Sequence, residues 1–400
     1  MLEAILEEAR RQRETAAWSE TTFSSLYLGG GTPSVIEPAV LANFLHELRA
    51  VFPLEAAAEI TLEANPDDVN QTAADTWLDA GVNRISLGLQ SLNDEELRWM
   101  NRSHTAIEAL TSLETLLQAG FPSVNADLIY GGPLRSDASW LHDLDFIFNS
   151  GVDHLSAYAL TLEERTPYEK LVHTGRYEAP EEQHQARQFE MLCERAEAAG
   201  WDHYEISNLA KPGHRARHNS AYWKNQPYLG LGPSAHSYDG AYRSWNPADN
   251  ALYIRAVTEG TEKEGELLGP KERYNEWLMT HLRMREGLDL DWARQHWPAF
   301  VPALEHELRK LEARAWVQHE GQHFSLSRSG RLYADAIAAG LMQVGEKVDV
   351  GGLRRNARID QHHGTVKIWS FFEVAAHHFV EIPALFFRHT GVTITRQIGQ

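Results

Sequence analysis

The strongest constraint on the fold is the regular alternation of short apolar segments with helical segments over residues 1–165. The helical segments are 38–52, 70–80, 105–120 and 139–151, and the apolar segments between them predict strands at 24–30, 58–66, 83–91, 123–133 and 152–163. Strict alternation of this kind predicts an α/β fold with a parallel sheet covered by helices. An open doubly wound sheet and a complete or partial (β/α) barrel both satisfy the pattern.

Polar residues and glycines gather where the predicted strands end. In both architectures the carboxyl ends of the strands form the ligand-binding edge. A buried strand gains nothing from ending in Glu or Gln, so several strands that do so indicate a ligand site. Ordinary solvent exposure of strand ends is the simpler alternative. The residues at these ends are Gly29, Gly30, Gly31, Thr32, Glu63, Asn65, Gln90, Asp127, Thr161 and Glu163.

The alternation stops after residue 163, and three further regions follow from residue 166 on. Residues 166–268 contain a long helix at 181–200 and a loop-rich segment at 212–240 that is dense in His, Tyr, Trp, Gly and Arg. Residues 269–342 predict helices and a hairpin turning at Gly321, the outline of a small winged-helix domain. Residues 343–400 show no clear periodicity and form an atypical extension of unknown role.

Composition excludes several classes of protein. With 37 basic and 56 acidic residues the formal charge is −19, which argues against nucleic acid as a partner because phosphate binding needs a basic face. The winged-helix outline therefore predicts a packing module. A single cysteine, Cys193, excludes a disulfide framework and favours the cytoplasm. The most apolar long window, 369–387, carries two Glu and a Pro, so no transmembrane span is expected.

Four motifs occur in order at the predicted strand ends: YLGGGTPS, EITLEANPDD, GVNRISLGLQSLNDEELRWMNRSH and NADLIYGGP. This ordered set resembles the radical S-adenosylmethionine (SAM) proteins related to oxygen-independent coproporphyrinogen III oxidase, and most of all the HemW family. The resemblance runs from about residue 20 to about residue 340. It implies a partial (β/α) radical-SAM barrel over residues 1–165, an extension over 166–268, and a C-terminal helical, winged-helix-like domain of the HemN type.

The resemblance also implies a SAM site at the strand ends. The GGGTP turn matches the segment that binds the amino group of the methionine moiety. A forked guanidinium suits the ligand's carboxylate. The implied SAM-binding residues are Gly30, Gly31, Thr32, Glu63, Gln90, Arg102 and Asp127.

One defining motif of these proteins is absent from this chain. Radical SAM proteins hold a 4Fe–4S cluster on a CxxxCxxC loop after the first strand, and the cluster supplies the electron that cleaves SAM. Cys193 lies in a predicted helix far downstream and cannot replace three thiolates. The chain therefore contains no ligand set for the cluster. We expect that the family's first strand and cluster loop are missing through truncation, rather than that the protein is a degenerate paralogue.

The motif HNxxYW within the loop-rich segment marks the HemW family and is linked there to haem binding. It comprises His218, Asn219, Tyr222 and Trp223. A neutral imidazole can be an axial iron ligand, and aromatic rings can flank a flat macrocycle. His214 and His236 are alternative ligands. A purely structural role for the motif is the competing interpretation, and a zinc site on His214 and His218 is weaker because no third ligand is evident.

The resemblance implies a haem chaperone that binds haem and passes it to acceptor proteins. Coproporphyrinogen III oxidase activity is the alternative, so whether the protein is an enzyme stays open. A cluster-less scaffold without catalytic function is a third hypothesis. A homodimer is one possible oligomeric state of the chain.

Overall fold

The computed structural model describes residues 1–163, 166–343 and 391–395. The predicted parallel sheet is present. Its five strands follow chain order, each parallel to the next: β1 (Phe23–Gly29), β2 (Leu54–Ala64), β3 (Arg84–Gln90), β4 (Ser123–Tyr130) and β5 (His154–Ala159).

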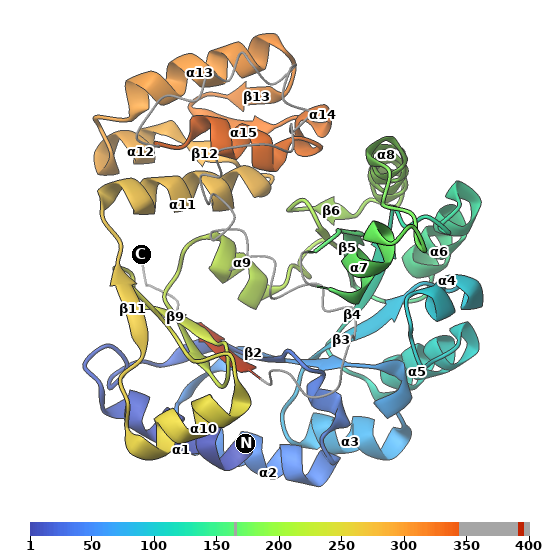
Figure 1. The fold of residues 1–400 in the computed structure, drawn as a ribbon, viewed down its shortest axis with the longest axis vertical. Helices are drawn as coiled ribbons and strands as arrows, with labels where there is room; N and C mark the ends of the chain where they lie inside the picture. The colour runs from blue at the N-terminus through green and yellow to red at the C-terminus, as the bar shows by residue number, and fades with distance from the viewer. Residues whose placement is uncertain (164–165, 344–390, 396–400) are drawn as a thin grey trace.

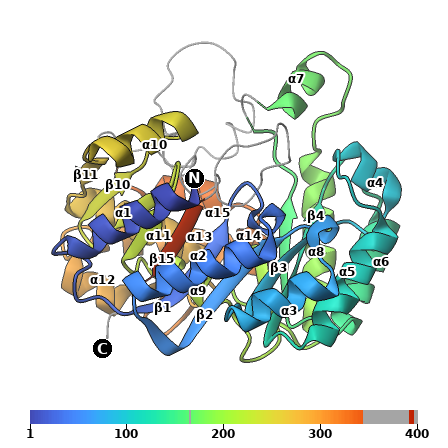
Figure 2. The same cartoon turned by 90° about the horizontal axis from the view of Figure 1, so that it is seen from below.

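Helices cover the outer side of these strands, as Figures 1 and 2 show. They are α1 (Leu2–Glu14), α2 (Pro38–Val51), α3 (Gln71–Asp79), α4 (Asp94–Trp99), α5 (Ala106–Ala119) and α6 (Asp137–Asn149). Local sequence sets their limits. Helix α5, for example, begins at a capping box between Thr105 and Glu108 and ends at Gly120, whose φ of 84° suits glycine.

The parallel strands belong to a larger curved sheet. Beyond β5 lie β7 (Asn208–Ala210) and β6 (Asp202–His203), and beyond β1 lie β15 (Gly391–Thr395), β8 (Tyr228–Leu231), β9 (His236–Tyr238), β10 (Tyr242–Trp245) and β11 (Glu264–Leu267). Strand β15 pairs antiparallel with both β1 and β8. Part of the extension at 343–400 thus contributes a strand of the central sheet, whereas 344–390 and 396–400 lie outside the described residues.

Helix α9 (Arg217–Trp223) lies inside the curve of the sheet rather than on its outer side (Figure 1). The remaining helices of this part are α7 (Pro167–His173), α8 (Glu182–Ala198) and α10 (Asn250–Glu259). The expected helix at 181–200 is α8. Buried Glu8 of α1 joins the outer helices to the strands around β8, because its carboxylate accepts hydrogen bonds from Gly232 N at 2.9 Å and Tyr253 Oη at 2.6 Å.

The C-terminal lobe, residues 270–341, has its own hydrophobic core and stands apart at the top of Figure 1. It comprises α11 (Pro270–Arg283), β12 (Leu288–Asp289), α12 (Leu290–His296), α13 (Val301–Ala313), β13 (Val317–Glu320), β14 (His323–Leu326), α14 (Arg328–Arg331) and α15 (Ala334–Leu341). The hairpin turns at Gly321, with φ of 60°, as predicted. After the hairpin the lobe closes with two short helices, α14 and α15. Among the described helices, none combines the length and the apolar character that crossing a bilayer requires.

Candidate functional site at the strand ends

The glycine turn after β1 has an unusual backbone. Gly30, Gly31 and Thr32 all have positive φ, at 77°, 56° and 56°. Glycine adopts this region freely, but threonine does so at a cost, which marks a constrained and often functional segment. Gly30 and Gly31 are exposed, so the turn offers its backbone to a ligand.

Glu63 near the end of β2 holds this turn. Its Oε2 accepts a hydrogen bond from Gly30 N at 3.0 Å, and its Oε1 accepts one from Tyr27 Oη at 2.7 Å. Gly29 makes room for the arrangement, because a Cβ there would lie 2.6 Å from Tyr27 Cε1 and 2.8 Å from Glu63 Oε1. The first glycine of the turn is therefore a packing requirement, and the next two are conformational ones.

Gln90 and Arg102 meet at the end of β3. Gln90 has a φ of 64°, again in the left-handed region. Arg102 donates from Nη2 to Asn65 Oδ1 at 2.9 Å and to Gly88 O at 3.3 Å. A Cβ on Gly88 would lie 3.0 Å from Gln90 Nε2 and 3.3 Å from Arg102 Nη2, so both side chains lie close over this glycine.

Asp127 of β4 is the second carboxylate of the site. Its oxygens accept hydrogen bonds from Asn125 Nδ2 at 2.7 Å and Ser86 Oγ at 3.1 Å. Burial raises the pKa of Asp127, while hydrogen bonds from Ser156, Asn125 and Ser86 oppose that shift. Sequence reasoning did not identify the serine and asparagine that hold this carboxylate.

These residues form one rim across four neighbouring strands. Glu63 pairs in register with Ser86, and Asp127 lies on the strand beyond. Two carboxylates and one guanidinium at a strand-end rim suit a ligand with both cationic and anionic groups. Thr161 and Glu163, at the end of β5, are hydrogen-bonded to each other at 2.9 Å.

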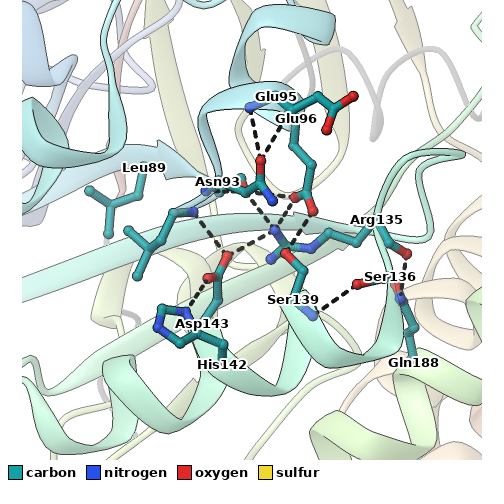
Figure 3. Close-up of polar contacts among 12 residues, drawn as sticks. Leu89, Asn93, Glu95, Glu96, Arg135, Ser136, Ser139, His142, Asp143 and Gln188 are labelled. Atoms are coloured by element: carbon teal, nitrogen blue, oxygen red, sulfur yellow. Dashed lines mark hydrogen bonds and ion pairs between the residues drawn. The ribbon is translucent and has the colours of Figure 1, made fainter.

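A buried ion cluster supports the segment after Gln90 (Figure 3). Arg135 Nη1 donates to Ser91 Oγ at 2.7 Å and pairs with Asp143 Oδ2 at 2.8 Å and with Glu96. Ser91 directly follows Gln90, and Asn93 N donates to Ser91 Oγ at 3.0 Å. The sequence did not predict a role for Arg135, because no local pattern distinguishes a loop arginine that becomes buried from one that stays exposed.

The HNxxYW motif forms helix α9 and is mostly buried. His218, Asn219 and Trp223 are 7%, 7% and 6% exposed. The His218 ring stacks on Tyr27, with centroids 4.9 Å apart, and its Nδ1 lies 3.0 Å from Ser25 Oγ. Tyr222 packs against Tyr228, with ring centroids 5.4 Å apart. The motif therefore contacts β1, the strand that leads into the glycine turn.

His214 and His236, the alternative haem ligands, have partners of their own in other parts of the structure. His214 Nδ1 lies 2.8 Å from Asp153 Oδ2, and His236 packs near Trp245, with centroids 6.0 Å apart. Cys193 is buried in α8, where burial raises the pKa of its thiol to about 11. Within the described ranges no cluster of three or more His, Cys, Asp or Glu side chains has the geometry to hold a metal ion.

Comparisons with known proteins agree with this fold. The Radical SAM superfamily model matches residues 2–147 and the HemN C-terminal domain model matches residues 268–333. The solved structure of coproporphyrinogen III oxidase (HemN) from Escherichia coli aligns with a TM-score of 0.72 at 22% identity, covering 86% of this chain and 82% of that one. The fold is that of a radical SAM protein: a partial (β/α) barrel with a HemN-type C-terminal domain.

Sequence relatives narrow the class to a family. Heme chaperone HemW from Mycobacterium tuberculosis is 35% identical over 80% of this chain and 81% of its own length. Heme chaperone HemW from Bacillus subtilis is 27% identical over 80% and 86%, and a mitochondrial radical S-adenosyl methionine domain-containing protein 1 from Danio rerio is 32% identical over 70% and 64%. The chain belongs to the HemW family.

Proposed function

We propose that this protein binds SAM at the strand-end rim and acts as a haem chaperone, binding haem and passing it to acceptor proteins. The observation that carries the proposal is the 35% identity to a relative named heme chaperone HemW over four-fifths of both chains. The cytoplasm as compartment, with acceptor proteins as partners, belongs to the same proposal. The HemN structure, at 22% identity, supports the fold and adds no evidence for oxidase activity.

The strand-end residues fit SAM by their chemistry. Gly30, Gly31 and Thr32 expose backbone groups for the methionine amino group, and Arg102 supplies a fork for its carboxylate. Glu63 and Asp127 bring negative charge toward a ligand that carries a sulfonium and an ammonium group. Gln90 adds an amide that can hydrogen-bond to the ligand. When bound, SAM supplies the carbon–sulfur bond that radical SAM chemistry breaks.

The residues of this chain do not fit a 4Fe–4S cluster. Such clusters need several thiolate ligands. Cys193 is the single cysteine, and its thiol is buried with a pKa raised to about 11. We therefore derive no step through the cluster. This same observation favours the second candidate function, a scaffold that retains the barrel without redox chemistry.

For haem we propose His218 as the ligand, with Asn219, Tyr222 and Trp223 beside it. Iron coordination needs an accessible ring nitrogen. Because His218 is only 7% exposed and its ring stacks on Tyr27, binding haem there requires α9 to move away from β1. We therefore expect haem to associate slowly with His218.

A haem titration followed by the Soret band tests this proposal. We expect a saturable shift in the full chain, a weaker one after His218→Ala, and transfer of the haem to an apo haem protein added in excess. The parent for both measurements carries Gln at His362, His363, His377 and His378, which lie outside the described residues and could bind haem non-specifically. A parent that neither binds haem saturably nor transfers it would contradict the chaperone function.

A further inference from the structure

The inner faces of β1 and β2 carry a row of polar residues that leads toward the glycine turn. Alternate residues of a strand share a face, so Ser25 and Tyr27 of β1 point to one side. Glu59 and Glu63 of β2 share a face in the same way. Each of these four side chains has a hydrogen-bond contact to α9, to the turn or to one another.

Glu59 fixes the start of α9. The N-cap residue of this helix, Ala216, has no side chain that can accept a hydrogen bond. Glu59 supplies the missing acceptor from β2, taking hydrogen bonds from Arg217 N at 2.8 Å and His218 N at 2.9 Å. A carboxylate at a helix N-terminus also interacts favourably with the helix dipole. The strand that carries Glu63 therefore also holds the helix that carries His218.

His218 in turn restrains Tyr27. The centroids of the two rings lie 4.9 Å apart, with an interplanar angle of 29°. The contact between His218 Nδ1 and Ser25 Oγ fixes the orientation of the imidazole ring. Stacked aromatic pairs of this kind contribute about 0.5–1.5 kcal/mol beyond the area they bury. The His218 ring thus restrains the Tyr27 ring.

Tyr27 passes this restraint to the site. Its hydroxyl donates to Glu63 Oε1 at 2.7 Å, and the other oxygen of that carboxylate receives Gly30 N. Burial and the neighbouring Glu63 and Asp127 carboxylates raise the pKa of Tyr27, so its hydroxyl stays protonated and remains a donor.

The far end of α9 is anchored in the C-terminal lobe. Arg283 of α11 lies over the Trp223 ring, with Cζ 5.3 Å from the centroid, and Asn225 Nδ2 donates to Thr280 Oγ1 at 3.1 Å. Helix α9 is therefore held at both ends and presents a fixed ring to Tyr27.

We propose that Tyr27 and His218 are positioning residues of the strand-end site: His218 sets the Tyr27 ring, and Tyr27 sets the Glu63 carboxylate and with it the glycine turn. On this account the HNxxYW helix supports the SAM site while its His218 ring remains packed on β1. The inference rests on the proposed SAM site for its ligand.

The first measurement needs no ligand. Hydrogen–deuterium exchange of the full chain follows the amides of residues 29–32, because Gly30 N donates to Glu63. Tyr27→Phe removes the hydroxyl and keeps the ring, and His218→Ala removes the stacking partner. Both are expected to speed exchange at the turn several-fold. His218→Phe keeps a flat ring against Tyr27 and should restore most of the protection.

The second measurement is SAM affinity by calorimetry. A hydrogen bond to a charged group contributes enough that Tyr27→Phe should weaken SAM binding about tenfold. His218→Ala should weaken it in the same direction, and the double variant should lose little more than Tyr27→Phe alone, because both act through one carboxylate.

Tyr253→Phe is the matched control. Tyr253 Oη also donates to a buried carboxylate, that of Glu8, at 2.6 Å, but on α10 and α1 away from the strand ends. The control should lose a similar amount of stability and leave both readouts at the wild-type level.

The outcomes separate this inference from the proposed function. Unchanged exchange at 29–32 in both Tyr27→Phe and His218→Ala overturns the positioning role, even if SAM binds normally. Faster exchange without any SAM binding to the wild type supports the positioning of Glu63 and overturns the proposed ligand. Equal effects of Tyr253→Phe on exchange at the turn would reduce both variants to general destabilisation and contradict the inference.

Discussion

Arg135 and Asp143 form an ion pair that water hardly reaches: Nη1 and Oδ2 are 2.8 Å apart, and the two side chains are 3% and 1% exposed. Glu96 completes the cluster by pairing with the same guanidinium nitrogen, Nη1 (Figure 3). One cation thus compensates two buried carboxylates. The cluster lies beneath the segment that follows Gln90, so the stability of the fold and the shape of the site are linked there.

Replacing this cation should destabilise the fold strongly. In Arg135→Met the carboxylates of Glu96 and Asp143 remain buried without a counter-charge, and loss of one partner of a buried pair costs about 3–5 kcal/mol. Urea unfolding measures the loss. Arg98→Met, whose guanidinium makes an exposed bond to Asp94 O, is the control and should change stability by less than about 0.5 kcal/mol. A loss below about 1 kcal/mol in Arg135→Met would show that the cluster is not essential.

A methyl group at Gly29 should damage the site directly. It would lie 2.6 Å from Tyr27 Cε1 and 2.8 Å from Glu63 Oε1, so one of these groups must shift. We expect Gly29→Ala to cost about 1–3 kcal/mol and to weaken SAM binding. The control is Gly132→Ala, where the nearest atom would be at an ordinary 3.5 Å. Equal SAM affinity in Gly29→Ala and the wild type would contradict our placement of Glu63 in the site.

The sequence was enough to predict the parallel strands, because their apolar segments and glycine stops are local signals. It also located Gly30, Glu63 and Gln90 at strand ends. It did not predict that Tyr27 contacts His218 or that Arg135 is buried, because both depend on which distant segments meet. Strand β15 was missed for the same reason: its partners, β1 and β8, are far away in the chain.

The spacing of two glutamates in β2 could have predicted part of the site. Glu59 and Glu63 are four residues apart, so a strand places both on one face. Two carboxylates on the inner face of a strand need hydrogen-bond donors. In the structure, α9 donates to Glu59 and the glycine turn donates to Glu63. The resemblance identified the HNxxYW residues but not the strand that holds them.

Acid should destabilise the fold through two half-buried histidines, His203 and His281. Burial lowers the pKa of His203 to about 4 and that of His281 to about 4, from the ordinary 6.5. Below pH 6.5 these histidines take up protons in the unfolded chain but stay neutral in the folded chain. The free energy of unfolding therefore decreases as the pH falls from 6.5 toward 4. Each histidine accounts for up to about 3 kcal/mol of that loss.

Urea unfolding at pH 7 and pH 5 checks this expectation. His203→Gln and His281→Gln should each reduce the difference in stability between the two pH values. His306→Gln, an exposed histidine of α13, should leave the difference unchanged. If neither His203→Gln nor His281→Gln alters the pH dependence, other groups control the acid response.

The last prediction concerns iron. Because a 4Fe–4S cluster is held by several thiolates, this 400-residue chain, with one cysteine, should not assemble one on anaerobic reconstitution with iron and sulfide. Iron and labile sulfide should stay far below about four of each per chain. Cys193→Ala is the control, and it should retain the same small amount of iron, since the buried thiol has a pKa raised to about 11 and is a poor ligand at neutral pH. Stoichiometric iron and sulfide in the parent, lost in Cys193→Ala, would mean that Cys193 recruits a cluster, for instance between two chains, and that the mismatch we infer is wrong.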